Sequence, residues 1–442
     1  MIFSSIEFIL FFIFFILLIK FFPNSQKTVI IISSLFFYSY WNPLFIFLII
    51  YLLLTTFLSL YKKLNLKIAI SIALLPLFYF KYSAFFFSVI PNNIFLNFSY
   101  FGELPLAISF ITFTIIALLI DVKKREFNEH LNFKDFSEFI IYFPQLIAGP
   151  ILRAKELIPK LKNKILFEDK NIRFGIILFT IGFVKKIFLA DNISIIIDPY
   201  FQNPELFTSS DLIKGYLLFP FQIYFDFSGY IDMAMGISIF LGIELPINFN
   251  RPYLTNSLTN FWRCWHITLS SWFRDYIYIP MGGSKKGNKS LYFNLIFTMT
   301  IAGLWHGASL NFIFWGFLNG IFLSIEKKLN LVNKDSLIRI LLNCFLVFNL
   351  WIVFRISEFS NLIHFFTITY SGIFEIFNFE NLIVLLIVVL LTLSQRYDNY
   401  FVIRKFSLKL NLFIIVPFFL VIIITGLAIS TGQSDKFIYF DF

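Results

Sequence analysis

Charged residues are scarce in this chain of 442 amino acids. They make up 14% of the sequence, whereas hydrophobic residues make up 58%, and the mean hydropathy is +0.80. Soluble domains carry roughly 25% charged residues. This composition therefore excludes an ordinary soluble enzyme.

The chain also lacks the common signatures of cofactor and metal binding. It has two cysteines, Cys264 and Cys344, which fit neither a zinc spacing nor a disulfide framework. A P-loop, a G-x-G-x-x-G motif after a strand and a Gly-x-Ser-x-Gly motif are missing as well. We therefore expect no metal site and no permanently bound cofactor, and a serine-elbow hydrolase is unsupported.

The formal net charge of +10 comes from short basic clusters between apolar runs. Such clusters mark the cytoplasmic loops of membrane proteins, whereas nucleic-acid binding needs basic residues gathered in a patch. The lipid bilayer is therefore the expected partner, and nucleic acid is not.

Long apolar runs dominate what is present. Runs of about 20 apolar residues are typical of membrane-spanning helices, and they recur along the whole chain. We predict an all-α polytopic integral membrane protein with about eleven spans in one domain over residues 1–442. The first lysine, Lys20, follows the first apolar run, which predicts an uncleaved span with its amino end outside. The basic clusters place the tail 430–442 outside too.

Several stretches interrupt the spans. Trp41-Asn42-Pro43 predicts a break between two helices, and the proline-rich stretch 133–173 predicts a re-entrant or interfacial segment. Residues 213–241 are expected to form a single helix, and residues 259–279 an amphipathic helix with three- and four-residue spacing of aromatic side chains. Residues 357–381 are expected to form a loop region.

The polar residues gather in one stretch, residues 219–308. His266 and His306 both lie there, each directly after a tryptophan, Trp265 and Trp305. Ionisable groups inside a membrane are costly and usually functional. His306, in an apolar helix, is a candidate general base for an oxygen nucleophile. His266 could be a second base, an orienting group, a substrate contact or a structural residue.

Other side chains of this stretch are weaker candidates. Asp226 and Asp232 lie six residues apart and share no helical face, so we favour structural pairing with Arg251, Arg263 or Arg274 over a paired-carboxylate mechanism. The polar and aromatic residues beside His266 either line a substrate tunnel or anchor an interfacial helix. They are Trp262, Trp265, Arg263, Arg274 and Asp275, with Trp305 as a further candidate next to His306.

Five motifs together resemble one family. WRCWHITLSSWFRDYIYIPMGG and AGLWHGAS are similar to motifs of the membrane-bound O-acyltransferase (MBOAT) family. Three further motifs resemble those of its bacterial branch that O-acetylates exported polysaccharides: FPQLIAGPILR, FPFQIYFDFSGYIDMAMG and the terminal FIYFDF. The teichoic acid D-alanyl transfer protein is a more distant relative of that branch. Two residues depart from that pattern: Cys264 stands where relatives often have a basic residue, and Asp441 where many have glutamine.

The resemblance implies a ring of helices around a central funnel, with re-entrant segments and His306 at the narrow centre. It also implies that His266 is the family's second polar position and that Tyr439 serves as an acyl relay. The expected function is transfer of acetyl from cytosolic acetyl-CoA across a bacterial inner membrane to a periplasmic SGNH-type transferase. The final acceptor would be a cell-wall or exported polysaccharide, with peptidoglycan favoured.

Two alternatives stay open. One is D-alanyl transfer to teichoic acid from a carrier protein. The other, of a different class, is a proton-coupled transporter or flippase that uses His266, His306 and the aspartates as a proton path.

Overall fold

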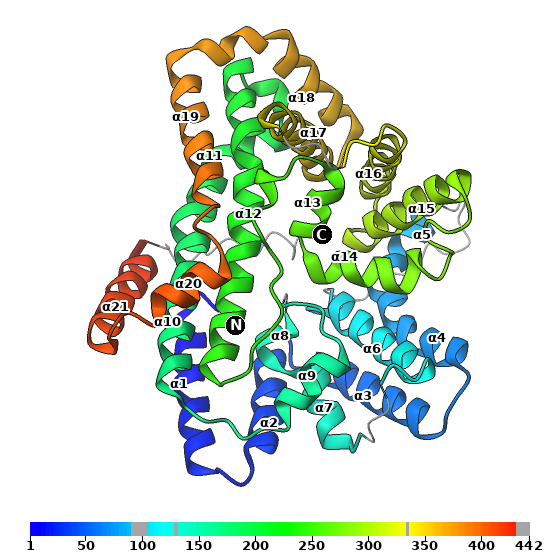
Figure 1. Ribbon diagram of the computed structural model, residues 1–442, viewed down its shortest axis with the longest axis vertical. Helices are drawn as coiled ribbons and strands as arrows, with labels where there is room; N and C mark the ends of the chain where they lie inside the picture. Colours follow the sequence, from blue (N-terminus) through cyan, green and yellow to red (C-terminus); the bar gives the residue numbers. More distant parts are fainter. Residues whose placement is uncertain (90–103, 128–130, 148, 333–335, 430–442) are drawn as a thin grey trace. The chain divides into compact units, whose positions relative to one another are not determined.

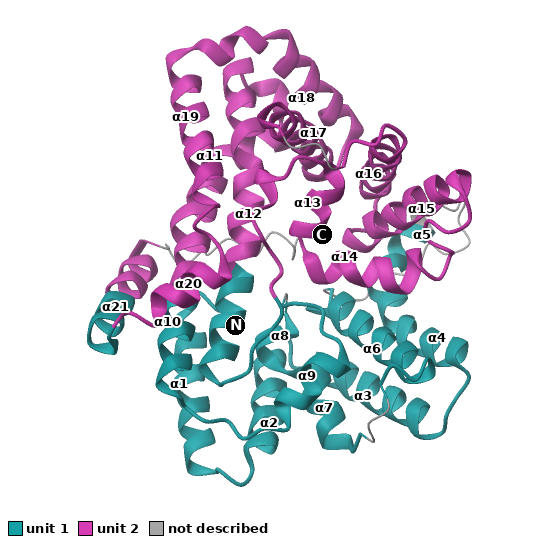
Figure 2. Ribbon diagram, in the orientation of Figure 1, with its two compact units in different colours: residues 1–179, 230–246, 411–420 teal, residues 180–229, 247–410, 421–442 magenta. Residues whose placement is uncertain are grey.

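The computed structural model describes residues 1–89, 104–127, 131–147, 149–332 and 336–429, and within these ranges the chain is helical with no strand (Figure 1). Two compact units divide it, each assembled from three segments (Figure 2). Unit 1 comprises residues 1–179, 230–246 and 411–420, and unit 2 comprises residues 180–229, 247–410 and 421–442.

Unit 1 begins with apolar helices and continues with short ones. Side-chain caps help to fix where several begin: Ser5 accepts from the Phe8 amide, and Asn65 from that of Lys67. Its helices are α1 (Ile6–Phe21), α2 (Gln26–Ser39), α3 (Phe45–Tyr61), α4 (Leu66–Leu77), the π-helix η1 (Phe78–Tyr82), α5 (Ser83–Val89), α6 (Ile108–Lys123), α7 (Phe133–Ile141), α8 (Phe143–Leu146), α9 (Ala154–Leu161) and most of α10 (Asp169–Phe183).

Unit 2 contains the polar stretch and the helices that follow it. These are the π-helix η2 (Val184–Ala190), α11 (Asp191–Gln202), η3 (Pro204–Leu206), most of α12 (Ser209–Phe240), η4 (Pro252–Leu254), α13 (Leu258–Cys264), α14 (Ile267–Phe273), the π-helix η5 (Arg274–Tyr278), α15 (Asn288–His306), α16 (Leu310–Lys328), α17 (Leu337–Arg355), α18 (Phe359–Ser371), η6 (Ile373–Phe377), α19 (Phe379–Ser394), α20 (Tyr400–Ser407) and the second part of α21 (Leu412–Ile429).

Some predicted elements are confirmed. Helices α2 and α3 are separate, with the Trp41-Asn42-Pro43 turn between them, and α12 is one long helix. Within the stretch 133–173 the chain forms the short helices α7 to α9 before α10 begins at Asp169, while the re-entrant or interfacial placement of this stretch stays a prediction.

Two predicted elements are wrong. Residues 259–279 are not one helix, because Trp265 is extended and His266 is left-handed, so that α13 ends and α14 begins there. Residues 357–381 are not a loop, because α18 and η6 occupy most of them. Basic residues are lacking there, which indicates on which side of a membrane a segment lies but not whether it is helical.

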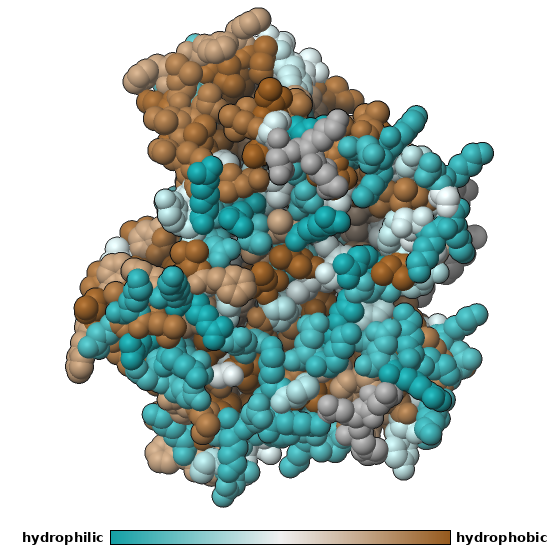
Figure 3. Space-filling model, viewed as in Figure 1, coloured by the Kyte–Doolittle hydropathy of each residue, from teal (hydrophilic) through white to brown (hydrophobic). Residues whose placement is uncertain are grey.

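Three helical segments among the described residues are long and apolar enough to cross a membrane: 66–86, 337–355 and 412–429. Shorter apolar helices include α3 and α19. On the face drawn in Figure 3, apolar residues gather over α18 and α19, whereas hydrophilic residues gather over α2, α7 and α9. The ring of about eleven spans, its funnel and the re-entrant segments stay predictions, as does the single domain.

Charged residues occupy every π-helical segment of the described chain. Lys81 lies in η1, Lys185 and Lys186 lie in η2, and Arg274 and Asp275 lie in η5. A π-turn inserts an extra residue into a helix and often marks a functional site. In η2 the extra residue allows two consecutive lysines to be buried.

Candidate functional site

Glycines hold helices α15 and α16 of unit 2 unusually close together. A Cβ atom on Gly303 would lie 2.1 Å from the carbonyl oxygen of Phe312, and one on Gly316 would lie 2.2 Å from that of Met299. Small residues at helix contacts allow such backbone approach in membrane proteins. The contact fixes the end of α15, where His306 is the last helical residue.

Aromatic rings enclose His306, which is buried. Its imidazole lies 5.3 Å from the ring of Trp315 and 5.3 Å from that of Phe354, with interplanar angles of 90° and 85°. Trp315 comes from α16 and Phe354 from α17. The candidate base therefore lies among aromatic rings from the three helices α15, α16 and α17.

His266 takes its position from a break in the backbone. Its φ of 43° and ψ of 56° place it in the left-handed region, where a residue other than glycine is strained. The preceding segment stabilises the break, since the Asn248 side chain accepts hydrogen bonds from the amide and hydroxyl of Thr268, both at 3.0 Å. Strain of this kind is retained where the surrounding contacts over-determine it.

Trp305 brings the two histidines together. Its ring lies 5.0 Å from that of His306 and 6.3 Å from that of His266. His266 also contacts Phe227 of α12, with ring centroids 4.7 Å apart. Residues from α12, the α13–α14 break, the end of α15, α16 and α17 thus form one cluster. We call it the histidine cluster: Phe227, His266, Trp305, His306, Trp315 and Phe354.

The two histidines are suited to different chemical roles. Helices α13 and α14 have seven residues each and are too short to span a membrane. Complete burial of His266 between them lowers its pKa to about 3. A base that weak accepts protons poorly at neutral pH, so His266 is suited to orienting a group as a neutral imidazole.

Further aromatic residues next to the histidine cluster are fixed by their own contacts. Trp265 is buried against Trp351, with ring centroids 4.8 Å apart. Trp262 donates a hydrogen bond from its indole to the side-chain oxygen of Asn319 at 3.2 Å. The buried Glu326 accepts from two amides at the start of α13, at 2.6 and 3.1 Å, and so fixes α13 against α16.

Asp226 is paired, but with a partner that the sequence did not suggest. Lys186 of η2 lies 2.6 Å from Asp226 and 2.7 Å from Asp191, and its side chain is almost fully buried. The expectation of a structural ion pair is confirmed, whereas the expected arginine partners are wrong for Asp226. Asp226 directly precedes Phe227, so this triad fixes the part of α12 that contacts His266.

A second buried charge network was missed. Lys185 lies 2.7 Å from Asp398, and the Tyr224 hydroxyl donates to the same carboxylate at 2.5 Å. The Tyr224 ring lies 6.2 Å from that of Trp265, behind the histidine cluster. The signal in the sequence is the pair of consecutive lysines, Lys185 and Lys186, inside an apolar run.

The remaining candidates have other surroundings. Arg263 is exposed and donates to Asn260 of its own helix, and exposed Arg274 pairs with Asp275 at 2.8 Å. Asp232 is half-buried and belongs to unit 1. Tyr439 lies outside the described residues. Among the described residues, no three histidine, cysteine or carboxylate side chains gather where they could hold a metal ion.

Comparison with known proteins settles the family. The sequence profile of the MBOAT, membrane-bound O-acyltransferase family matches residues 28–365, which include the whole histidine cluster. The chain belongs to the membrane-bound O-acyltransferase family. Apolar helices long enough to cross a membrane fit this membership.

Several curated MBOAT relatives are similar to this chain. A probable alginate O-acetylase AlgI of Pseudomonas syringae is 38% identical over 257 residues, covering 57% of this chain and 49% of the relative. A peptidoglycan O-acetyltransferase of Helicobacter pylori is 35% identical over 347 residues, covering 69% of this chain and 65% of the relative. A teichoic acid D-alanyltransferase of Bacillus subtilis is 29% identical over 246 residues, covering 52% of this chain and 60% of the relative. The chain thus spans about half the length of the alginate relatives that it matches.

Proposed function

We propose that this MBOAT protein is an O-acetyltransferase that takes acetyl from cytosolic acetyl-CoA and passes it across the membrane for modification of a polysaccharide. The observation that carries the proposal is the pair of buried histidines on either side of Trp305. The alginate and peptidoglycan relatives support the substrate class, with peptidoglycan favoured because the Helicobacter pylori match covers more of the chain.

His306 is the proposed general base. It removes the proton from an attacking hydroxyl, whose oxygen then bonds to the thioester carbonyl carbon. The carbon–sulfur bond breaks as the tetrahedral intermediate collapses, and the leaving thiolate takes the proton from the imidazolium. The apolar rings around His306 exclude water, so that hydrolysis of the thioester does not compete with transfer.

His266 and Tyr439 have supporting roles in this scheme. Neutral His266 orients the hydroxyl or the thioester carbonyl through a hydrogen bond, since its lowered pKa makes it a weak base. Tyr439 is the proposed attacking hydroxyl and carries the acetyl group to the outer side of the inner membrane. A periplasmic SGNH-type transferase would then move the acetyl group to the glycan. Both chain ends would face that side.

D-alanyl transfer to teichoic acid is the second candidate, and the Bacillus subtilis relative favours it. The same base and the same bond changes apply, with a carrier-protein thioester as donor. A proton-coupled transporter is the third, and the buried Lys185 and Lys186 networks favour it. Transport differs from both because it consumes no thioester.

The test measures thiol release by the purified protein in detergent, with acetyl-CoA or a D-alanyl carrier thioester as donor. We expect release from acetyl-CoA that His306→Ala abolishes and that His364→Ala retains, because His364 is exposed on α18 and outside the cluster. Thermal unfolding of both variants checks that they fold. Release by His306→Ala at the wild-type rate would refute its role as base.

Mass spectrometry of the carboxyl-terminal peptide tests the relay separately. An acetyl group on Tyr439 that is lost in Tyr439→Phe supports the relay. Thiol release without this adduct would remove the relay and keep the acyltransferase. If neither donor is consumed, the acyltransferase proposal fails and transport becomes the question.

A further inference from the structure

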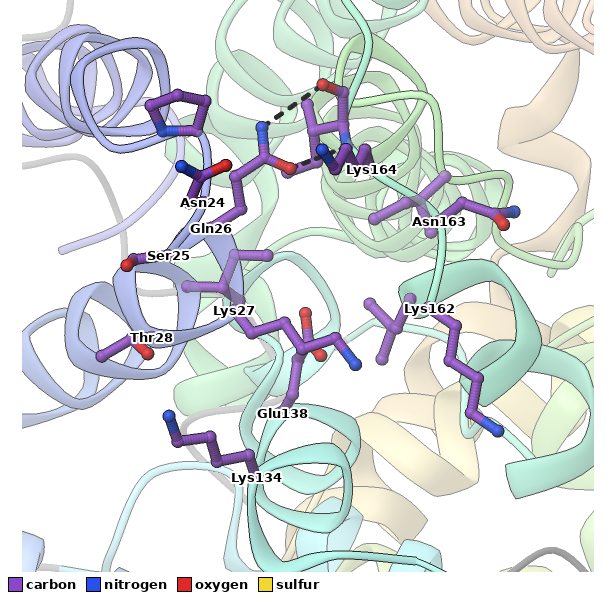
Figure 4. A pocket seen from close by; sticks show the side chains of 15 residues that line it. Asn24, Ser25, Gln26, Lys27, Thr28, Lys134, Glu138, Lys162, Asn163 and Lys164 are labelled. Atoms are coloured by element: carbon purple, nitrogen blue, oxygen red, sulfur yellow. Dashed lines mark hydrogen bonds between the residues drawn. The ribbon is translucent and has the colours of Figure 1, made fainter.

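A basic pocket lies in unit 1, among residues that the acyl-transfer scheme does not use. Its volume is about 390 Å³, within the range of small-molecule sites. The lining comes from the α1–α2 turn, the start of α2, helix α7, the segment after α9 and Ile243 (Figure 4).

Four lysines and one carboxyl group supply the charge of this pocket. The lysines are Lys27, Lys134, Lys162 and Lys164, and the carboxyl group belongs to Glu138. Lys27 forms an ion pair with Asp135, whereas the described residues contain no ion-pair partner for Lys134 or Lys164. The side-chain amides of Asn24 and Asn163 add hydrogen-bond donors, whereas that of Gln26 bonds to the backbone of Ile165. The pocket thus has the charge and donors to hold an anion.

Glu138 is a second, independent observation that points to a ligand in this pocket. The residue is 1% exposed, and neither carboxyl oxygen has a hydrogen-bond partner. Buried polar groups without partners are rare and need an explanation. In Figure 4 its side chain extends from α7 into the same space as that of Lys27 from α2. A protonated carboxyl group here could donate a hydrogen bond to a bound anion.

The surroundings of the pocket are apolar and exposed. Phe21 is 75% exposed and Phe22 is 53% exposed at the end of α1, beside the lining residues that start at Pro23. Leu166 follows the lining residue Ile165 and is 61% exposed. Apolar side chains that border a basic pocket at the end of the apolar helix α1 suit a ligand with an anionic head and hydrocarbon chains.

We propose that this pocket binds the phosphate headgroup of an anionic phospholipid from the adjacent leaflet, with its acyl chains along the exposed apolar side of α1. Lys134 and Lys164 contact the phosphate, and Glu138 completes its hydrogen bonds. The lipid would hold α2, α7 and the segment after α9 together, because the pocket is lined by all three.

The test is native mass spectrometry of the full chain in detergent, titrated with phosphatidylglycerol or phosphatidylcholine. We expect tighter binding of phosphatidylglycerol. The double variant Lys134→Gln and Lys164→Gln should weaken it about 25-fold, since one lysine near an anionic headgroup contributes about a fivefold factor. The matched control is Lys62→Gln with Lys67→Gln, the same charge change at exposed lysines just after α3 and at the start of α4. It should bind like wild type.

Three results would overturn the proposal. One is an equal loss of phosphatidylglycerol affinity in both double variants, which would mean that the lipid is attracted by the overall positive charge of the protein. Another is equal affinity for the two lipids. The third is displacement of phosphatidylglycerol by inorganic phosphate or adenosine 3′,5′-bisphosphate, which would assign the pocket to a free phosphate compound. If the double variant does not fold, a phosphatidylglycerol with a photoreactive headgroup decides, because it must label peptides 20–28 or 161–166 of the wild type.

Discussion

The buried carboxyl group of Glu138 should make the stability of this protein depend on pH. Burial raises the pKa of its carboxyl group from 4.5 to about 7; the charge of Lys27 opposes this rise, and that of Asp135 adds to it. Helix α7 has nine residues and does not span the membrane. The folded protein therefore holds a proton on Glu138 that the unfolded chain has released over the whole interval from pH 4.5 to 7.

The sign follows from proton linkage. Where the folded state binds more protons, the free energy of unfolding falls as pH rises. Each pH unit of the interval is worth about 1.4 kcal/mol, which gives about 3 kcal/mol in total. The contribution of Glu138 is thus full below pH 4.5 and is lost as pH rises to about 7.

Glu138→Gln replaces the carboxyl group with a neutral amide of the same shape. We expect the variant to resemble wild type at pH 5 and to be more stable by about 3 kcal/mol at pH 8, because it no longer buries a charge. Thermal unfolding in detergent from pH 5 to 8 measures the difference. The matched control is Glu156→Gln, an exposed carboxylate of α9 whose loss should leave the wild-type slope intact.

The reasoning fails if Glu138→Gln and wild type have parallel stability profiles from pH 5 to 8. A variant that is destabilised at pH 8 would also contradict it, since that would mean that the ionised carboxylate has a stabilising partner. A flatter slope in Glu156→Gln than in wild type would show that this exposed carboxylate also causes the pH dependence, and the assignment to Glu138 would fail.

Three other predictions concern unit 2. Lys186→Met should lower the free energy of unfolding by about 3–5 kcal/mol, because it leaves two carboxylates of a buried network uncompensated. The control Lys214→Met removes a lysine from an ion pair open to solvent and should lower it by at most about 1 kcal/mol. Equal losses of stability in thermal unfolding of the two variants would contradict this prediction. Gly316→Ala should destabilise by about 1–3 kcal/mol through its clash with the α15 backbone, whereas Gly215→Ala, which meets only ordinary contacts, should be neutral or stabilising. Trp305→Ala should lower thiol release from acetyl-CoA about 100-fold, because both histidine rings lose the indole that positions them. Trp305→Phe should keep most of the activity. Equal activity of the two variants would show that Trp305 does not position the histidines.

Composition and apolar runs were enough to predict a helical membrane protein, and the motifs around His266 and His306 were enough to predict its family. Composition is sufficient because the bilayer requires long apolar helices. The motifs are sufficient because an ionisable histidine inside an apolar run costs free energy and is therefore usually functional. The long helix α12 was also readable, since apolar patterning marks it locally.

Tertiary structure alone decided which polar groups meet. The sequence assigned arginine partners to Asp226, but the nearest cation in space is Lys186, which the π-turn of η2 directs inward. It predicted a continuous helix over residues 259–279, but hydrogen bonds from Asn248 stabilise a left-handed His266. Both outcomes depend on contacts between residues distant in sequence, about 20 positions apart for Asn248 and Thr268 and 40 for Lys186 and Asp226. Local propensity carries no information about such contacts, because they form only after the helices have packed.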